Sequence, residues 1–249
     1  ADVQPMQTHY AFTCGDVDLK VTFTAPLFME DLKLLSRPVN YLTYSVAARD
    51  GKEHEVEVYF EASPRWALDQ PYQQSASKGY EADGLLYLKS GSKEQNILAK
   101  QGDDLRIDWG YFYMVAGKEN TAYSVGNSTE LRKNFVNGTL NSASLEGEDS
   151  NGNMALVRSY GKVKNVTDKI MLGYDDIYSI QYFGTNLRPY WNSKGDRTIE
   201  AEMLAAYNEY DKLLARCYAF DKKLMEDASA AGGKEYAELC ALAYRQSIA

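Results

Sequence analysis

The stretch from Glu61 to Asp69 (EASPRWALD) brings together residue types that could do chemistry, directly after a predicted strand. Loops that follow strands commonly carry binding and catalytic groups. The candidate site residues are Glu61, Arg65, Trp66 and Asp69, which supply two carboxylates, a guanidinium and an indole. The same composition suits a structural corner, and that interpretation is favoured. No residue is assigned a catalytic role.

Nucleophile motifs are weak in this chain. The spacing Ser-x-x-Lys, which can pair a hydroxyl with an amine across one helical turn, occurs at Ser75/Lys78 and at Ser90/Lys93. Both pairs stand in Ser- and Gly-rich segments that we predict to be loops, so no helix would hold the two groups together. A catalytic triad would have to use His9 or His54, and no Gly-x-Ser-x-Gly elbow accompanies either of them. We expect His54 simply to open a strand.

Metal and paired-acid sites are not predicted either. The sequence has no His-x-x-x-His pair. Asp149, Asn151 and Asn153 match the first ligands of a calcium loop, but Met154 stands where glycine is needed and Tyr160 where the bidentate glutamate belongs. We therefore expect a polar surface loop, no metal and no cofactor. Other acids cannot be paired by sequence alone, namely Glu30/Asp31, Glu61, Asp69 and Asp175/Asp176.

Composition excludes several classes of partner. The 249 residues carry a formal net charge of −8 with no cluster of Lys and Arg, which disfavours nucleic acid. No apolar run approaches the roughly 20 residues of a membrane-spanning helix. The cysteines, Cys14, Cys217 and Cys240, have no metal or framework spacing, and we expect them to be reduced and unpaired.

Aromatic residues are abundant, with 20 Tyr, 8 Phe and 3 Trp. Aromatic faces bind sugars, but they also fill thick sandwich cores, and the core is the favoured interpretation. The exposure of Trp66, Trp109 and Trp191 separates these alternatives.

Alternation of apolar and polar residues predicts an antiparallel β-sandwich over residues 1–192. Asp16 to Thr24 is one half-buried strand, and Leu105 to Val115 is a long one. Asp50-Gly51 tolerates a tight turn, so Asn40 to Arg49 and His54 to Glu61 are predicted to form a hairpin. Further strand candidates are Tyr80 to Leu88, Asn96 to Lys100, Met154 to Tyr160 and the segment around Tyr178 to Tyr182.

The periodicity becomes helical in the segment 193–249. Apolar residues recur every three or four positions from Ile199 to Leu224, with Thr198 as a cap. Gly232-Gly233 should stop this helix, and a second one carries Tyr236, Leu239, Cys240, Ala243 and Tyr244 on one face. The second helix ends without a stop signal, so we expect a boundary inside a larger helical structure, although a fraying natural terminus would read the same way.

Three stretches carry a resemblance to a known family: Leu27 to Tyr44 (LFMEDLKLLSRPVNYLTY), Asp50 to Asp69, and Gly232 to Ala249. Together they resemble the glutaminase A-like family of fungi and Bacteroides-type bacteria. The resemblance implies a β-rich domain leading into an (α/α) six-hairpin domain, whose first helices correspond to Asp196 to Ala249. It also implies a secreted, periplasmic or envelope-attached protein and hydrolysis of glutamine to glutamate and ammonia. It supplies no catalytic residues.

The leading functional hypothesis is a non-catalytic sandwich module of a glutaminase-like hydrolase, partnered by the remainder of its own chain. The substrate of the whole protein would be a small amide. The alternative is a carbohydrate-binding or accessory module of a six-hairpin glycoside hydrolase, with a sugar ligand. An independently active enzyme is the weakest hypothesis, because a structural interpretation is favoured for each of the candidate catalytic motifs above.

Overall fold

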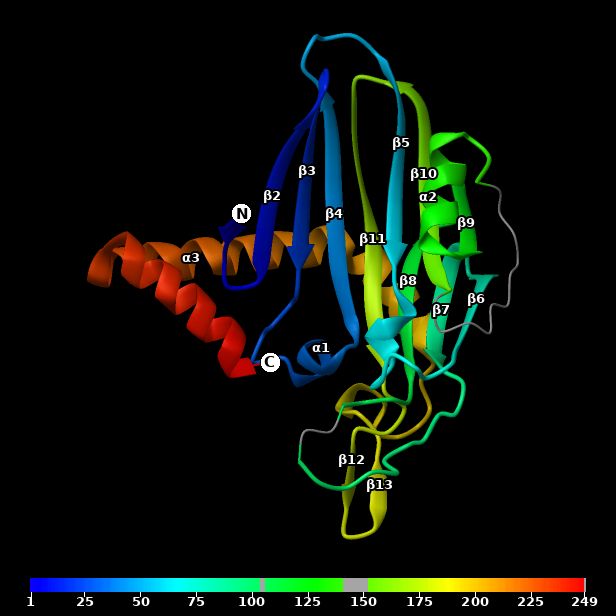
Figure 1. Cartoon of the computed structure of the whole chain (residues 1–249). Helices are drawn as coiled ribbons and strands as arrows, with labels where there is room; N and C mark the ends of the chain where they lie inside the picture. Colours follow the sequence, from blue (N-terminus) through cyan, green and yellow to red (C-terminus); the bar gives the residue numbers. More distant parts are fainter. Residues whose placement is uncertain (104–105, 141–151, 249) are drawn as a thin grey trace.

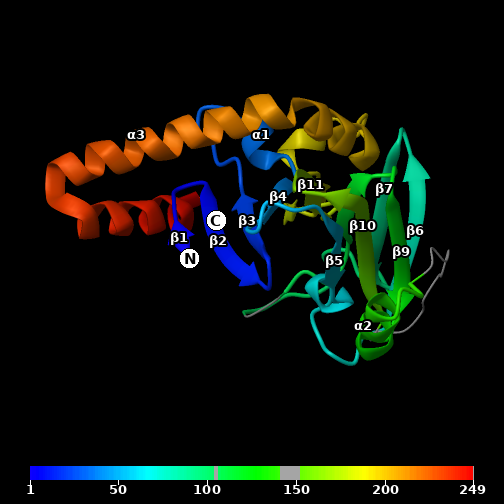
Figure 2. The same ribbon diagram turned by 90° about the horizontal axis from the view of Figure 1, so that it is seen from above.

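The computed structural model describes residues 1–103, 106–140 and 152–248, which form three layers (Figures 1 and 2). The middle layer is an eight-stranded antiparallel sheet with the order β1-β2-β3-β4-β11-β8-β7-β6. Its strands are β1 (Asp2–Val3), β2 (Gln7–Cys14), β3 (Val17–Thr24), β4 (Val39–Ala48), β6 (Ser75–Ala82), β7 (Leu85–Ser92), β8 (Tyr111–Gly117) and β11 (Asn165–Asp175).

A smaller sheet covers part of one face of the large one, and a helix crosses the other. The small sheet has the order β5-β10-β9, with β5 at His54–Ala62, β9 at Thr121–Gly126 and β10 at Asn153–Val163. The hairpin β12 (Ile180–Tyr182) and β13 (Thr185–Leu187) projects from one end. Short helical elements are α1 (Leu32–Ser36), η1 (Pro64–Ala67), α2 (Ser128–Val136) and η2 (Tyr190–Asn192). The predicted fold class, a β-sandwich followed by a helical segment, is confirmed.

The large sheet has a hydrophobic core on each face. Tyr113 and Val115 of β8 belong to the core beneath the long helix, whereas Phe112 and Met114 belong to the core between the two sheets. Both faces of a central strand are therefore buried, which explains why β8 is continuously apolar from Phe112 to Ala116.

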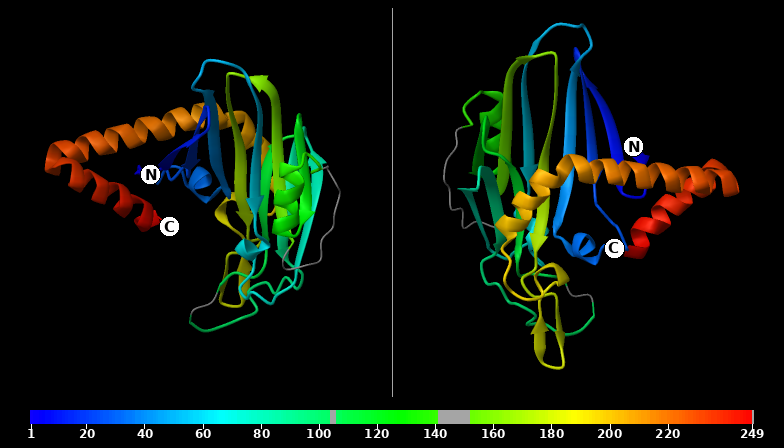
Figure 3. Two further views of the ribbon diagram at one scale, coloured as in Figure 1. Left: turned by 45° about the horizontal axis from the view of Figure 1, so that its top comes forward. Right: turned by 180° about the vertical axis from the view of Figure 1, so that it is seen from behind.

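The long helix α3 (Ile199–Ile248) crosses the back of the large sheet (Figure 3). Thr198 begins it as predicted, because its Oγ1 accepts a hydrogen bond from the N–H of Ala201 at 3.2 Å. Gly233 has a φ of +83°, and the helix bends there. The segment after the bend turns back toward the first strands (Figure 2), and Tyr244 Oη donates to the carbonyl of Leu27 at 2.5 Å.

The predicted hairpin around Asp50-Gly51 is wrong. The strand β4 pairs with β3 and β11 in the large sheet, whereas β5 pairs with β10 in the small one. Gly51 does adopt a positive φ of +73°, but the chain crosses between layers there. The apolar faces of the two strands meet across the sandwich, where the rings of Tyr44 and Phe60 lie 5.0 Å apart. Turn chemistry alone does not specify which strand edges will pair.

The long strand predicted over Leu105 to Val115 is also shorter than expected. Strand β8 begins at Tyr111, because Gly110 has a φ of +77° and interrupts the extended backbone. The alternation at Ile107 to Trp109 is therefore not that of a strand, and Leu105 lies outside the described residues. Residues Asn96 to Lys100 form turns and irregular backbone. By contrast, the candidates Tyr80 to Leu88 and Met154 to Tyr160 lie within β6, β7 and β10, with a turn at Asp83-Gly84.

Candidate functional site

The segment from Glu61 to Asp69 is an ordered corner that joins β5 to the loop before β6. Ser63 Oγ accepts the N–H of Arg65 at 3.3 Å, and Pro64 begins the 3₁₀-helix η1. Ala67, the last residue of η1, is fully buried. The corner directs the candidate side chains into different surroundings, so the structure does not assemble them into one site.

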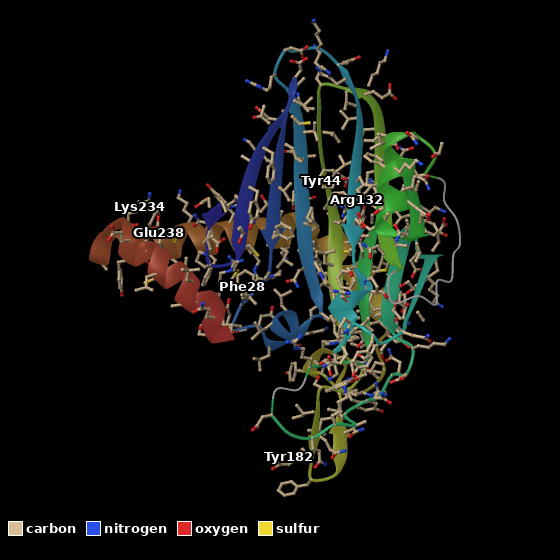
Figure 4. All side chains as sticks on the ribbon, viewed as in Figure 1. Phe28, Tyr44, Arg132, Tyr182, Lys234 and Glu238 are labelled. Carbon is tan, nitrogen blue, oxygen red and sulfur yellow. The ribbon has the colours of Figure 1, made fainter. Side chains whose placement is uncertain are left out.

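Glu61 is held in a structural ion pair at the end of β5. Its Oε2 lies 2.6 Å from Nε of Arg132 on α2 (Figure 4), and its Oε1 accepts a hydrogen bond from Asn153 of β10 at 2.5 Å. Burial acts to raise the pKa of Glu61, but hydrogen bonds from Ser128, Arg132 and Asn153 outweigh it and lower that pKa. This carboxylate therefore stays charged and connects three elements of the sandwich.

Trp66 lies at the surface, 62% exposed, with its ring 5.0 Å from that of Phe112 in an edge-on arrangement. It lines a largely apolar cleft of about 560 Å³ together with Phe23, Tyr174 and Arg245. Neighbouring Arg65 is exposed as well.

The other two tryptophans are buried. Trp109 is 9% exposed, and its Nε1 donates to the carbonyl of Tyr178 at 3.0 Å. Trp191 is 4% exposed. The three tryptophans therefore do not form an exposed row, and the core interpretation holds for two of them.

Asp69 joins a polar cluster that the sequence did not reveal. Lys100 Nζ lies 2.9 Å from Asp69 Oδ2 and 2.8 Å from Asp108 Oδ2. Hydrogen bonds to Asp108 and Asp69 raise the pKa of Lys100, and the bond from Lys100 lowers the pKa of Asp69. The two partners stand 31 and 39 positions after Asp69, so no local motif could have pointed to them.

A second polar cluster lies between the two sheets and was also missed. The guanidinium of Arg158 on β10 pairs with Asp168 on β11 and donates to the carbonyl of Glu119 at 2.9 Å. Tyr160 Oη donates to Asp168 at 2.7 Å, and the hydroxyls of Tyr160 and Tyr44 are hydrogen-bonded. Burial acts to raise the pKa of Asp168, but the bonds from Tyr160 and Arg158 keep it below its ordinary value. The arrangement satisfies buried charge across the layers.

Ser75, Lys78 and Ser90 lie on strands rather than in the predicted loops, whereas Lys93 follows the end of β7. Ser75 and Lys78 are both on β6, where residues three apart point to opposite faces of the sheet. Ser90 is on β7, and its hydroxyl is 2.8 Å from that of Ser77. The spacing that pairs a serine with a lysine on a helix cannot do so on a strand.

The remaining motifs also have structural roles. His54 opens β5 as expected, with Nε2 2.9 Å from Asp50 Oδ1, and Nδ1 of His9 lies 3.0 Å from Thr22 Oγ1. Asp31 caps α1 through the N–H of Leu34 at 3.1 Å. Within residues 1–103, 106–140 and 152–248, no three His, Cys, Asp or Glu side chains could hold a metal ion.

Part of the calcium-like segment, with Asp149 and Asn151, lies outside the described residues. Asp175 is half-buried, and its partial burial raises its pKa. In the described part of the chain, no helix is long and apolar enough to cross a membrane.

Comparison with known proteins identifies one relative and one family that this chain resembles. Glutaminase A of Aspergillus oryzae is 27% identical over an alignment of 258 positions that covers 96% of this chain. The chain spans 36% of the length of that protein. Residues 6–227, from the start of the first long strand into α3, match the family described as "Domain of unknown function (DUF5127)". Because the match covers both sheets and most of the long helix, the chain belongs to the DUF5127 family.

Proposed function

We propose that the chain is a β-sandwich module of a larger hydrolase that acts on glutamine, and that it supports the reaction without carrying it out. The amide substrate follows from the similarity to Glutaminase A. The supporting role follows from the candidate loop. One observation carries it: both acids of that loop, Glu61 and Asp69, are already paired with a basic side chain.

This pairing matters because a general acid or base must exchange its proton near the working pH. The pKa of Glu61 and that of Asp69 both lie below their ordinary values, which keeps these carboxylates ionised. Glu61 is also surrounded by donors from β10 and α2. Each group suits an anchor between loops better than a proton carrier.

The surface of α3 supports contact with further helices. Beyond Gly233, Ala237 and Ala241 face the buried side, whereas Leu239 and Leu242 are 61% and 45% exposed. Apolar side chains at such positions suit an interface. We therefore propose a sandwich over residues 1–192 and a helical segment over 193–249 that opens a six-hairpin domain. On the family resemblance alone, we also propose a secreted, periplasmic or envelope-attached location.

The test compares the chain by itself with the full-length natural gene product, measuring ammonia release from glutamine. We expect release by the full-length protein and none above the buffer blank by residues 1–249. Activity of the isolated chain that Glu61→Gln or Asp69→Asn abolishes would overturn the supporting role. A full-length protein that leaves glutamine intact would overturn the substrate.

A further inference from the structure

A polar cavity of about 310 Å³ lies between the loop that follows η1 and the loop that follows β7. Both loops lie toward the end of the sandwich that carries the β12–β13 hairpin (Figures 1 and 3). The lining includes three glutamines, an asparagine, an aromatic ring and an ion pair, from Gln70, Gln73, Gln74, Asn96, Tyr72, Lys100 and Asp108. The cavity is separate from the cleft beside Trp66.

The carboxylate of Asp108 is the buried polar centre of this cavity. The residue is 1% exposed, and its Oδ2 accepts hydrogen bonds from Lys100 Nζ at 2.8 Å and from Gln73 Nε2 at 3.0 Å. Its Oδ1 has no hydrogen-bond partner among the described residues. A buried carboxylate with donors on only one of its oxygens is costly, so a further hydrogen-bond donor placed in the cavity beside this charge is favoured.

The loops around the cavity are fastened from behind, so its polar groups are held in place. Gln73 Oε1 accepts the N–H groups of Asp69 at 2.8 Å and of Gln70 at 2.9 Å. On the other loop, Gln95 donates to the carbonyl of Gly110 at 3.1 Å and accepts its N–H at 2.7 Å. Groups ordered before binding lose less entropy when a ligand arrives.

The chemistry of the lining selects a class of ligand. Side-chain amides both donate and accept, Lys100 donates and Asp108 accepts, which together match hydroxyl groups that need both roles. The ring of Tyr72 is 79% exposed and offers an aromatic face to C–H groups of a ligand. The acids in and beside the cavity, Asp69, Glu94 and Asp108, outnumber its lysines, Lys93 and Lys100, so the charge disfavours an anion. The volume is at the low end for small-molecule sites, enough for a single ring.

We propose that this cavity binds a neutral monosaccharide, with Asp108 and Lys100 on its hydroxyls and Tyr72 against its ring. The inference does not depend on glutamine hydrolysis, because the cavity belongs to the sandwich itself. A purely structural role for Lys100, as a connection between the two loops, is the competing interpretation. It predicts no saturable ligand.

The test titrates the purified chain separately with glucose, galactose, mannose and N-acetylglucosamine, following binding by calorimetry or by NMR shifts. We expect saturable binding of at least one sugar. Tyr72→Ala should weaken it by about tenfold or more, since stacking on an exposed ring is lost. Asp108→Asn should weaken it as well. Trp66→Ala, an aromatic truncation in the other cleft, should leave the affinity unchanged.

Three results would overturn the proposal. These are no saturation with any of the four sugars, full affinity in Tyr72→Ala, and a loss in Trp66→Ala equal to that in Tyr72→Ala. Because Tyr72 is largely exposed, its variant is expected to fold, and the melting temperature checks this. The outcome is therefore informative even where Asp108→Asn destabilises the loops.

Discussion

The carboxylate of Asp221 on α3 accepts a hydrogen bond from the backbone N–H of Met6 at 2.8 Å, across 215 positions of sequence. Asp221 is 3% exposed, and burial raises its pKa to about 6, although the Met6 N–H and Arg245 act in the opposite direction. The long helix is thus fastened to the first strands through a carboxylate that is costly to ionise.

This contact predicts an unusual pH dependence. The folded pKa of Asp221 lies above the value of about 3.9 for an unfolded chain, so the native state binds more protons between about pH 4 and pH 6. The contribution of this group to stability is therefore present below about pH 4 and is lost as pH rises through 6.

Asp221→Asn should keep the bond from Met6 and remove the charge. We expect it to stabilise the chain at pH 7 by roughly 1 kcal/mol or more. The advantage should disappear near pH 4, as measured by urea unfolding of both proteins across this range. An advantage that is constant with pH would contradict the assignment.

We expect the stability of the fold to depend strongly on the buried ion pair of Glu202. Its side chain is fully buried, 3.2 Å from Nε of Arg37 and in contact with Arg197. Glu202→Gln should lower the free energy of unfolding by about 2 kcal/mol, because it leaves the half-exposed Glu209 as the counter-charge of the buried Arg37 guanidinium. Asp227→Asn, which removes the exposed partner of Lys223 on the same helix, is the matched control and should leave the melting temperature unchanged. Equal losses of stability in the two variants would contradict the claim that the effect depends on burial.

At position 110, both the backbone conformation and the space available for a Cβ atom require glycine. It has a φ of +77°, and a Cβ there would lie 2.2 Å from the carbonyl oxygen of Asp175. Gly84 has a similar φ of +78° with no atom within 4 Å, so it isolates the conformational cost. We expect Gly84→Ala to cost about 1–2 kcal/mol and Gly110→Ala clearly more, by thermal unfolding. Comparable losses of stability in the two variants would mean that the backbone at residue 175 can move away from the added Cβ without cost.

We expect the cysteines to differ in their reactivity toward thiol reagents. None of the three is in a disulfide, as expected, and Cys14 is exposed while Cys217 is fully buried. Burial raises the pKa of the Cys217 thiol to about 12, which keeps it protonated and unreactive. Thiol titration should modify Cys14 in the native state and all three cysteines after unfolding. Fast native modification of Cys217 would show that α3 opens.

The local elements were largely predictable. Alternation identified the strand Asp16 to Thr24, and Thr198 with Gly233 marked the beginning and the bend of α3. The pairing of strands was not predictable in the same way. Asp50-Gly51 specifies a turn, but the partner of β5 depends on where Phe60 finds an apolar surface, and that surface includes Tyr44 of the facing sheet.

The same distinction between local and tertiary information applies to the candidate site. Residue types alone identified Asp69 and Trp66 as groups able to bind, and the charge of −8 argued against nucleic acid. Their surroundings came from tertiary structure. Lys100 connects Asp69 with Asp108 only because two loops meet at one end of the sandwich.

The sequence by itself determined many of the strands and the long helix, because apolar periodicity and capping residues act over a few neighbouring positions. Only the tertiary structure decided which strands pair, which tryptophans are buried and which charges meet. Those outcomes depend on burying apolar surface between layers far apart in the chain, and on neutralising the charges enclosed with it.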